Sequence, residues 1–151
     1  MTAFLLDLII FLYSVKYYYH KNFEDLPKKS WALLLNKVLI KATHLEVSMT
    51  FSKAALSEAL TNAVIPLPNN PHRVYNATHR FRLTSEVITE VRKKEYSSWD
   101  NNKLEDPAFY QKDILLLGTI SHEDLVIMLL SELDRSALND KSFAFYEEYI
   151  L

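Results

Sequence analysis

Residues 114–131 contain two apolar runs, 114–120 and 125–130, separated by a polar segment of four residues. A connection of this length predicts an antiparallel hairpin, because short polar turns join neighbouring strands. Both runs are apolar at successive as well as alternate positions, so both faces of each strand should be buried. We therefore expect these strands at the centre of a sheet that is covered by helices.

The remaining periodicity predicts a mixture of helices and strands. Apolar side chains recur every three or four positions over residues 30–42, which predicts an amphipathic helix. Residues 44–51 alternate strictly and predict a half-buried strand. Aromatic and β-branched residues over 73–83 predict a further strand. Short helices are expected after Ser52, after Thr84 or Ser85, and over 131–138, and residues 97–112 are expected to form a polar loop.

The N-terminal segment, residues 3–19, is too continuously apolar for its period to separate a helix from a strand, and its length favours a helix. The apolar part, 3–15, is shorter than the roughly twenty residues of a membrane span. Basic residues follow this part, whereas a signal peptide carries them before it. We expect a buried helix in a cytoplasmic protein without membrane contact, with an interfacial anchor as the alternative.

Length and composition favour a single α+β domain over residues 1–151. We predict that N-terminal helices pack on a small antiparallel sheet that ends in a C-terminal β-hairpin. The chain has 151 residues, of which 49% are hydrophobic and 24% charged, so it falls among globular proteins. The predicted strands are 44–51, 73–83, 114–120 and 125–131.

The absence of cysteine and the single glycine, Gly118, exclude several kinds of site. Without cysteine there are no disulfides, Cys-ligated zinc sites or iron–sulfur clusters. Phosphate-binding loops of nucleotide enzymes need several glycines, because the backbone must approach the phosphate closely. We therefore expect no cofactor.

Charge is distributed unevenly between the two parts of the chain. Residues 1–94 hold thirteen Lys and Arg against seven Asp and Glu, whereas residues 95–151 hold four against twelve. The two parts can simply complement each other within one domain. The alternative is an acidic, aromatic-rich surface, formed by 97–112, the hairpin turn and the tail 143–151, that binds a basic protein surface. The candidate partner-binding residues are Trp99, Asp106, Phe109, Tyr110, His122, Glu123 and Asp124.

The hairpin turn also contains the best candidate for catalysis. His122 is a potential base beside Ser121, although consecutive turn residues rarely meet in the geometry of a nucleophile and its base. A metal site would need His122 and Asp124 to meet His44 from another strand. These possibilities make a hydrolase or metal-dependent enzyme the alternative function.

A nucleic-acid interface is a further possibility that the sequence disfavours. Arg73, Arg80 and Arg82 alternate with aromatic residues on a predicted strand, as in sheets that stack bases. The isoelectric point of about 6.2 lacks the basic excess of nucleic-acid-binding domains, so we expect no nucleic-acid partner.

A small α+β domain without a catalytic motif is typical of small inhibitors, including immunity proteins that block toxins. We therefore expect a non-catalytic protein-binding module, of inhibitor or immunity type, that occludes a basic surface of its partner. Its oligomeric state is left open by the sequence.

Overall fold

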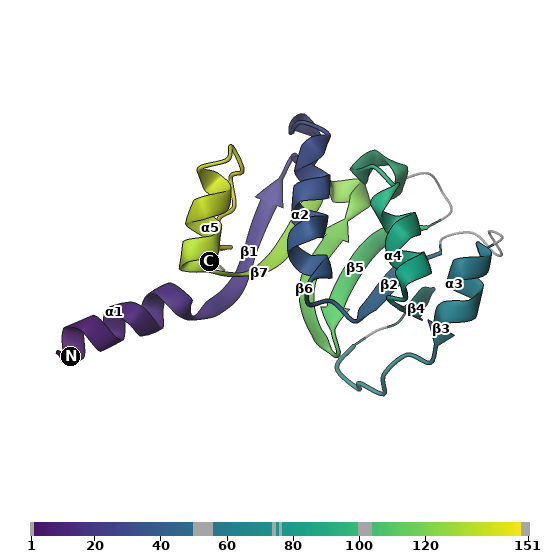
Figure 1. Ribbon diagram of the computed structural model, residues 1–151, viewed down its shortest axis with the longest axis horizontal. Helices are drawn as coiled ribbons and strands as arrows, with labels where there is room; N and C mark the ends of the chain where they lie inside the picture. Colours follow the sequence, from purple (N-terminus) through teal and green to yellow (C-terminus); the bar gives the residue numbers. More distant parts are fainter. Residues whose placement is uncertain (1, 50–55, 74, 76, 100–103, 149–151) are drawn as a thin grey trace.

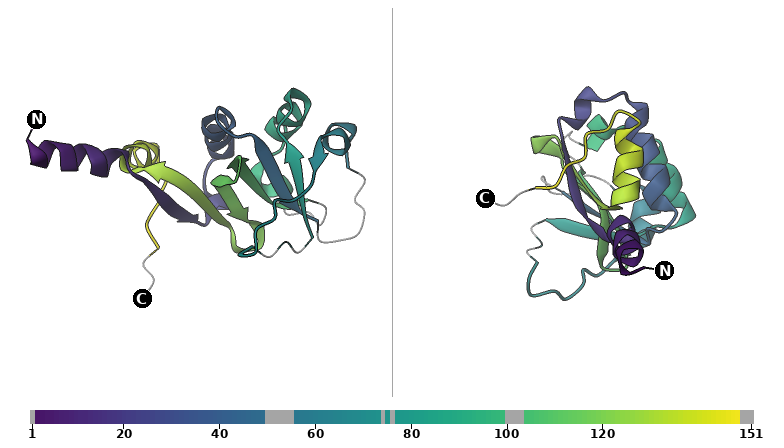
Figure 2. Two further views of the ribbon diagram at one scale, coloured as in Figure 1. Left: turned by 90° about the horizontal axis from the view of Figure 1, so that it is seen from below. Right: turned by 90° about the vertical axis from the view of Figure 1, so that its left-hand side faces the viewer.

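The computed structural model describes residues 2–49, 56–73, 75, 77–99 and 104–148. It contains a seven-stranded antiparallel sheet with the strand order β1-β7-β6-β5-β2-β4-β3. Helices α2, α3, α4 and α5 lie on one face of this sheet (Figures 1 and 2). The helices are α1 (Ala3–Tyr13), α2 (Lys29–Leu39), α3 (Glu58–Ala63), α4 (Ser85–Arg92) and α5 (Glu132–Asn139). The strands are β1 (Val15–Lys21), β2 (His44–Ser48), β3 (Val64–Ile65), β4 (Thr78–Arg82), β5 (Glu105–Gln111), β6 (Ile114–Ile120) and β7 (Leu125–Ser131).

The predicted hairpin is confirmed as β6 and β7, joined by the 3-10 turn η3 (Ser121–Glu123). Both strands are internal, because β7 pairs with β1 and β6 pairs with β5 on their other sides. Leu117 and Met128 face each other and are fully buried, whereas Ile127 and Leu129 are only half-buried. The hairpin is therefore central as predicted, but helices cover only one of its faces.

The predicted helix at residues 30–42 is confirmed as α2 and supplies much of the core. Its side chains Trp31, Leu34 and Leu35 are buried at the predicted spacing. They belong to the same cluster as the sheet residues Leu45 and Phe81. A spacing of three or four residues places these side chains on one face of the helix, which explains why the helix could be predicted from the sequence.

Helix caps fix where two of the shorter helices begin. The Thr84 hydroxyl accepts a hydrogen bond from the Val87 N–H and starts α4, as predicted. The Ser131 hydroxyl accepts from the Asp134 N–H and starts α5. Ser57 caps α3; the expected cap Ser52 and the expected end of the strand at residues 50 and 51 lie outside the described residues.

The prediction of a polar loop over residues 97–112 was wrong for most of its length. The short 3-10 helix η2 (Tyr96–Trp99) comes first, and residues 105–111 form β5 in the middle of the sheet. Pro107 lacks an N–H, and it lies where the register between β5 and β2 shifts between Glu46 and Ser48. A bulge of this kind tolerates proline, because no ladder hydrogen bond is needed there.

The N-terminal prediction was wrong in two respects. Helix α1 ends at Tyr13, and the tyrosine-rich segment that follows is the edge strand β1. No residue of α1 is buried, and the helix projects beyond the edge of the sheet (Figures 1 and 2). Within the described ranges, no helix is both long and apolar enough to cross a membrane.

The C-terminal tail packs against the rest of the chain over residues 143–147. Phe143 and Phe145 are buried, and the backbone groups of Tyr146 and Tyr19 exchange hydrogen bonds of 2.8 and 2.9 Å. The tail therefore covers part of the open edge of β1, which limits edge-to-edge pairing there.

Candidate functional site

The turn between β6 and β7 is tied to the 3-10 helix η1 (Phe23–Asp25) at one end of the sheet. Asp124 adopts a left-handed conformation with a φ of 49°, and its carboxylate oxygens accept from the Glu24 N–H at 3.1 and 3.2 Å. The Phe23 N–H donates to the Asp124 carbonyl at 3.4 Å. We call this region the acidic end and define it by the side chains of Glu24, Asp25, Glu95, Asp106, Glu123 and Asp124.

Asp106 and Ser121 build the neighbouring part of the acidic end. The Asp106 carboxylate accepts from the Ser121 N–H at 2.7 Å, and the Asp106 N–H donates to the Ser121 hydroxyl at 3.2 Å. This reciprocal pair fixes the start of β5 against the hairpin turn. Asp106 and Asp124 therefore hold the local backbone together, and the Ser121 hydroxyl serves the same purpose.

An aromatic hollow of about 520 Å³, including its open mouth, lies beside these carboxylates. The rings of Phe23, Trp31 and Tyr96 line it, with centroid separations of 4.7 Å for Phe23–Tyr96 and 5.3 Å for Trp31–Tyr96. Glu95 and Lys28 also line the hollow and form an exposed ion pair at 3.0 Å. Glu24 lines it as well, so aromatic faces and two exposed carboxylates meet in one depression.

Two polar groups in the hollow are held in unusual environments. The Trp31 indole N–H is buried and has no hydrogen-bond partner among the residues that the structure describes. Burial raises the pKa of the Tyr96 phenol, and the nearby carboxylates of Asp124, Glu24 and Asp106 raise it further. Carboxylates therefore lie close enough to the Tyr96 hydroxyl to disfavour a further negative charge there.

The structure divides the seven predicted partner-binding residues into two groups. Trp99, Phe109 and Tyr110 are exposed by 2%, 0% and 7%, so they pack inside the chain and do not form a docking surface, which corrects that part of the prediction. The other four residues lie at the acidic end. His122 and Glu123 are exposed and face each other at 3.7 Å, and Asp106 and Asp124 are half-buried.

The aromatic hollow could not be expected from the sequence. Phe23 and Trp31 come from the segment around α2, whereas Tyr96 follows α4 by several residues, so no local pattern joins them. The only available signal was the adjacency of acidic and aromatic residues, at Phe23 with Glu24 and at Glu95 with Tyr96.

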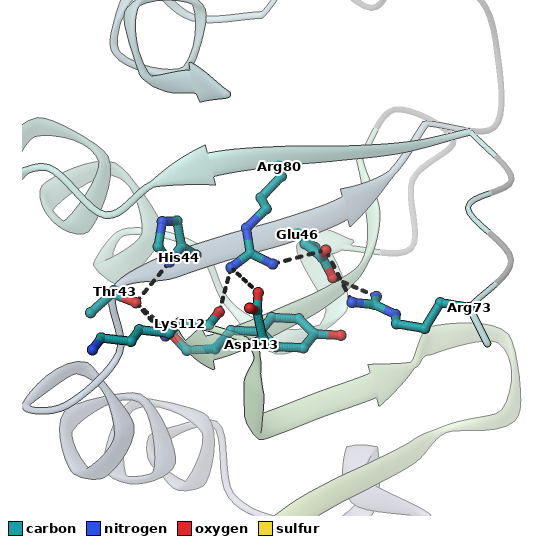
Figure 3. Close-up of polar contacts among 8 residues, drawn as sticks. Thr43, His44, Glu46, Arg73, Arg80, Lys112 and Asp113 are labelled. Atoms are coloured by element: carbon teal, nitrogen blue, oxygen red, sulfur yellow. Dashed lines mark hydrogen bonds and ion pairs between the residues drawn. The ribbon is translucent and has the colours of Figure 1, made fainter. Parts of the chain in front are cut away.

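A second polar cluster occupies the sheet face that the helices leave open (Figure 3). Glu46 on β2 is buried, and its carboxylate oxygens lie 2.7 Å from Arg73 Nη2 and 3.4 Å from Arg80 Nη1. Arg80 also faces Asp113 at 3.4 Å and donates to the Lys112 carbonyl. Because these cations are already paired within the chain, the cluster gives little support to a phosphate-binding surface.

The Tyr110 ring is part of this cluster. Its centroid lies 5.1 Å from the Arg73 guanidinium and 5.4 Å from that of Arg80. Burial raises the pKa of the Tyr110 phenol, and the negative charge of Glu46 raises it further. Tyr110 therefore serves as a packing surface for two paired arginines, which explains why it is unavailable to a partner.

The residues of the catalytic alternative do not lie together in the structure. His44 begins β2 and pairs with Tyr110 near the β5–β6 turn, at the end of β6 opposite to His122. Over the described ranges, no three His, Asp or Glu side chains gather closely enough to hold a metal ion. The geometry of the turn thus offers polar surface and no assembled nucleophile–base pair.

In comparisons with known proteins, no family model, no curated protein sequence and no solved structure matches this chain.

Proposed function

We propose that this chain is a non-catalytic protein-binding module, of inhibitor or immunity type, whose acidic end docks on a basic surface of its partner and occludes it. The aromatic hollow carries the proposal, because it joins aromatic side chains to two exposed carboxylates in a concave site. Concave sites of this composition are typical places for an anchoring side chain of a partner.

A basic segment satisfies each chemical feature of the hollow. A Lys or Arg side chain over the Tyr96 ring gains a cation–π contact, and Glu24 and Glu95 supply the opposite charge. Lys28 holds Glu95 in the free protein, so the arriving cation exchanges one exposed ion pair for another.

The structure also determines which charges are suitable for testing. Asp106 and Asp124 bond backbone N–H groups, so their reversal would damage the fold of the acidic end. Glu24, Glu95 and Glu123 are exposed, and none of their side-chain contacts within the described residues holds the backbone, so their charges can be changed to test the steering of a partner. Variants of these three residues should therefore change the association with a partner without changing the stability of the fold.

The test uses fluorescence from Trp31. The chain has two tryptophans, so the variant Trp99→Phe leaves Trp31 as the single reporter inside the hollow. An arginine- and lysine-rich peptide is titrated into this protein at low and at physiological salt, beside an acidic peptide of equal length. We expect a saturable change in Trp31 emission with the basic peptide alone, and weaker binding at the higher salt.

Matched variants complete the experiment. Glu24→Gln combined with Glu95→Gln should weaken the basic peptide roughly tenfold, whereas Glu58→Gln, an exposed carboxylate on α3, should leave binding unchanged. Equal binding of acidic and basic peptides, or equal effects of the two sets of variants, would refute the proposed site.

A further inference from the structure

Helix α1 exposes more apolar surface than an isolated protomer can readily keep in water. Its sequence is AFLLDLIIFLY, in which Asp7 is the only charged residue, and none of its residues is buried. A helix that is apolar on all sides is normally covered by other protein or by lipid. Phe4, Leu5, Leu6, Leu8, Ile9, Ile10, Phe11 and Tyr13 are exposed by 38–77%.

A second apolar surface of the same protomer is also uncovered. A groove of about 1020 Å³, including its open mouth, runs between the end of α2, the start of α5 and the sheet. Val15, Ile40 and Ile114 line this groove and are themselves exposed, Ile40 by 84%. We call it the α2–α5 groove. Helix α1 extends away from the sheet (Figures 1 and 2), and none of its residues lines the groove.

We propose that the α2–α5 groove receives helix α1 of a second copy of this chain, and that the exchange is reciprocal in a two-fold symmetric dimer. The hinge is Ser14, between the end of α1 and Val15, which is the first residue of β1 and already lines the groove. A reciprocal exchange about a two-fold axis closes after two copies, whereas a head-to-tail exchange would give a ring or an open polymer. This inference is independent of the proposed function.

The areas fit a stable dimer. The exposed side chains of α1 amount to roughly 800 Å², about what one partner contributes to an interface of standard size. The area that the two helices bury in a reciprocal exchange is therefore that of a standard protein interface, even without further contacts between the two sheets.

Charge identifies the occupant more specifically. Asp7 is exposed near the middle of α1, and Lys41 is exposed at the rim of the α2–α5 groove. Neither residue forms an ion pair within the described part of the chain, whereas the neighbouring Lys37 is held by Asp134 at 2.7 Å. Lys41 lies close enough to Asp134 to help lower the pKa of that carboxyl, but it forms no direct ion pair with a described residue, and its charge is opposite to that of Asp7. A membrane-surface helix would instead carry basic residues, and α1 has none.

The first experiment measures the molar mass by light scattering during size-exclusion chromatography over a concentration series. We expect twice the protomer mass of 17.6 kDa for the wild type. Asp7→Lys and Lys41→Asp should each raise the dissociation constant at least tenfold, and the double variant in one chain should restore the dimer. Ile40→Glu should disrupt it as well, while Val64→Glu, at another exposed apolar site on β3, should not. Circular dichroism confirms that each variant remains folded.

The second experiment uses the absence of native cysteine. Protein with Ile9→Cys is mixed with protein carrying Ile40→Cys, and disulfide-linked heterodimers are counted under mild oxidation; Val64→Cys replaces Ile40→Cys in the control. We expect cross-linking with position 40 alone, which also excludes docking of α1 into its own groove.

Three results would overturn the proposal. One is a wild type that stays at 17.6 kDa throughout the concentration series. Another is a dimer that neither Lys41→Asp nor Ile40→Glu weakens. The third is a monomer that floats with phosphatidylcholine–phosphatidylglycerol vesicles through α1, because lipid would then be the occupant.

Discussion

Replacement of Glu46 tests how the open face of the sheet is stabilised. Glu46→Gln keeps the shape of the side chain but removes the negative charge that faces both Arg73 and Arg80. The Arg80 side chain is only 4% exposed, so its guanidinium cannot regain hydration when the carboxylate is lost. Its remaining partners are the Lys112 carbonyl and the Asp113 carboxylate, which is largely in solvent.

The expected loss follows from this geometry. Removing one partner of a buried ion pair costs about 3–5 kcal/mol, because the other charge remains buried. Arg73 is partly exposed and Arg80 keeps two weaker partners, which places Glu46→Gln at about 3 kcal/mol. For a chain of this size that loss lowers the melting temperature by roughly 6–12 °C.

The assay is urea unfolding at neutral pH, followed by tryptophan fluorescence. Asp113→Asn removes the exposed carboxylate on the same arginine and should cost less than about 1 kcal/mol, which makes it the matched control. Replacing Glu46 and Arg80 together with methionine should cost less than Glu46→Gln alone. If Glu46→Gln unfolds within about 0.5 kcal/mol of the wild type, the argument from an uncompensated buried charge is wrong.

Two further predictions concern a buried histidine and a helix cap. Burial beside Phe23 and Phe145 lowers the pKa of His20 below its ordinary 6.5, so the unfolded chain takes up this proton more readily than the folded one. The free energy of unfolding should therefore fall as the pH decreases through about 6.5. In urea titrations at several pH values, His20→Leu should reduce this dependence of the unfolding free energy on pH. An unchanged pH dependence in the variant would assign the effect to another group. Thr84→Ala removes the hydroxyl that accepts from the Val87 N–H, and should lower the free energy of unfolding by about 1 kcal/mol in the same assay. The control is Thr89→Ser at an exposed position in the interior of α4, which should leave the free energy of unfolding unchanged.

Elements with a clear local period could be predicted from the sequence. In α2, the spacing of Trp31, Leu34 and Leu35 indicates which face of the helix is buried, and the structure buries that face. In the hairpin, the two apolar runs indicate two neighbouring strands, and the structure pairs them as β6 and β7. The α+β class follows from these elements. Strand β5 could not be predicted in this way, because Asp106 and Pro107 are typical of a turn. Pairing with β2 and β6 on both sides overrides that local preference.

The candidate site was predictable only in part, for a similar reason. The polar turn residues His122, Glu123 and Asp124 are consecutive in the sequence, so their placement at one end of a hairpin followed from the turn itself. The burial of Trp99 and the meeting of Phe23 with Tyr96 depend on tertiary packing between distant segments. Aromatic residues look alike in a sequence, whether they serve the core or a surface.

The central claim is that the acidic end docks on a basic surface of a partner protein. The measurement that tests it most directly is the rate at which that partner associates with the chain. A tagged protein is used to isolate its partner from a lysate, and the purified partner is then bound to surface-coupled wild type at two salt concentrations. The acidic-end variant carries Glu24→Lys, Glu95→Lys and Glu123→Lys, and the control variant carries the same reversals at Glu58, Asp140 and Glu148, which are also exposed. Docking through the acidic end predicts an association rate that falls with salt and drops at least tenfold in the first variant alone. Equal association rates for the two variants would contradict it.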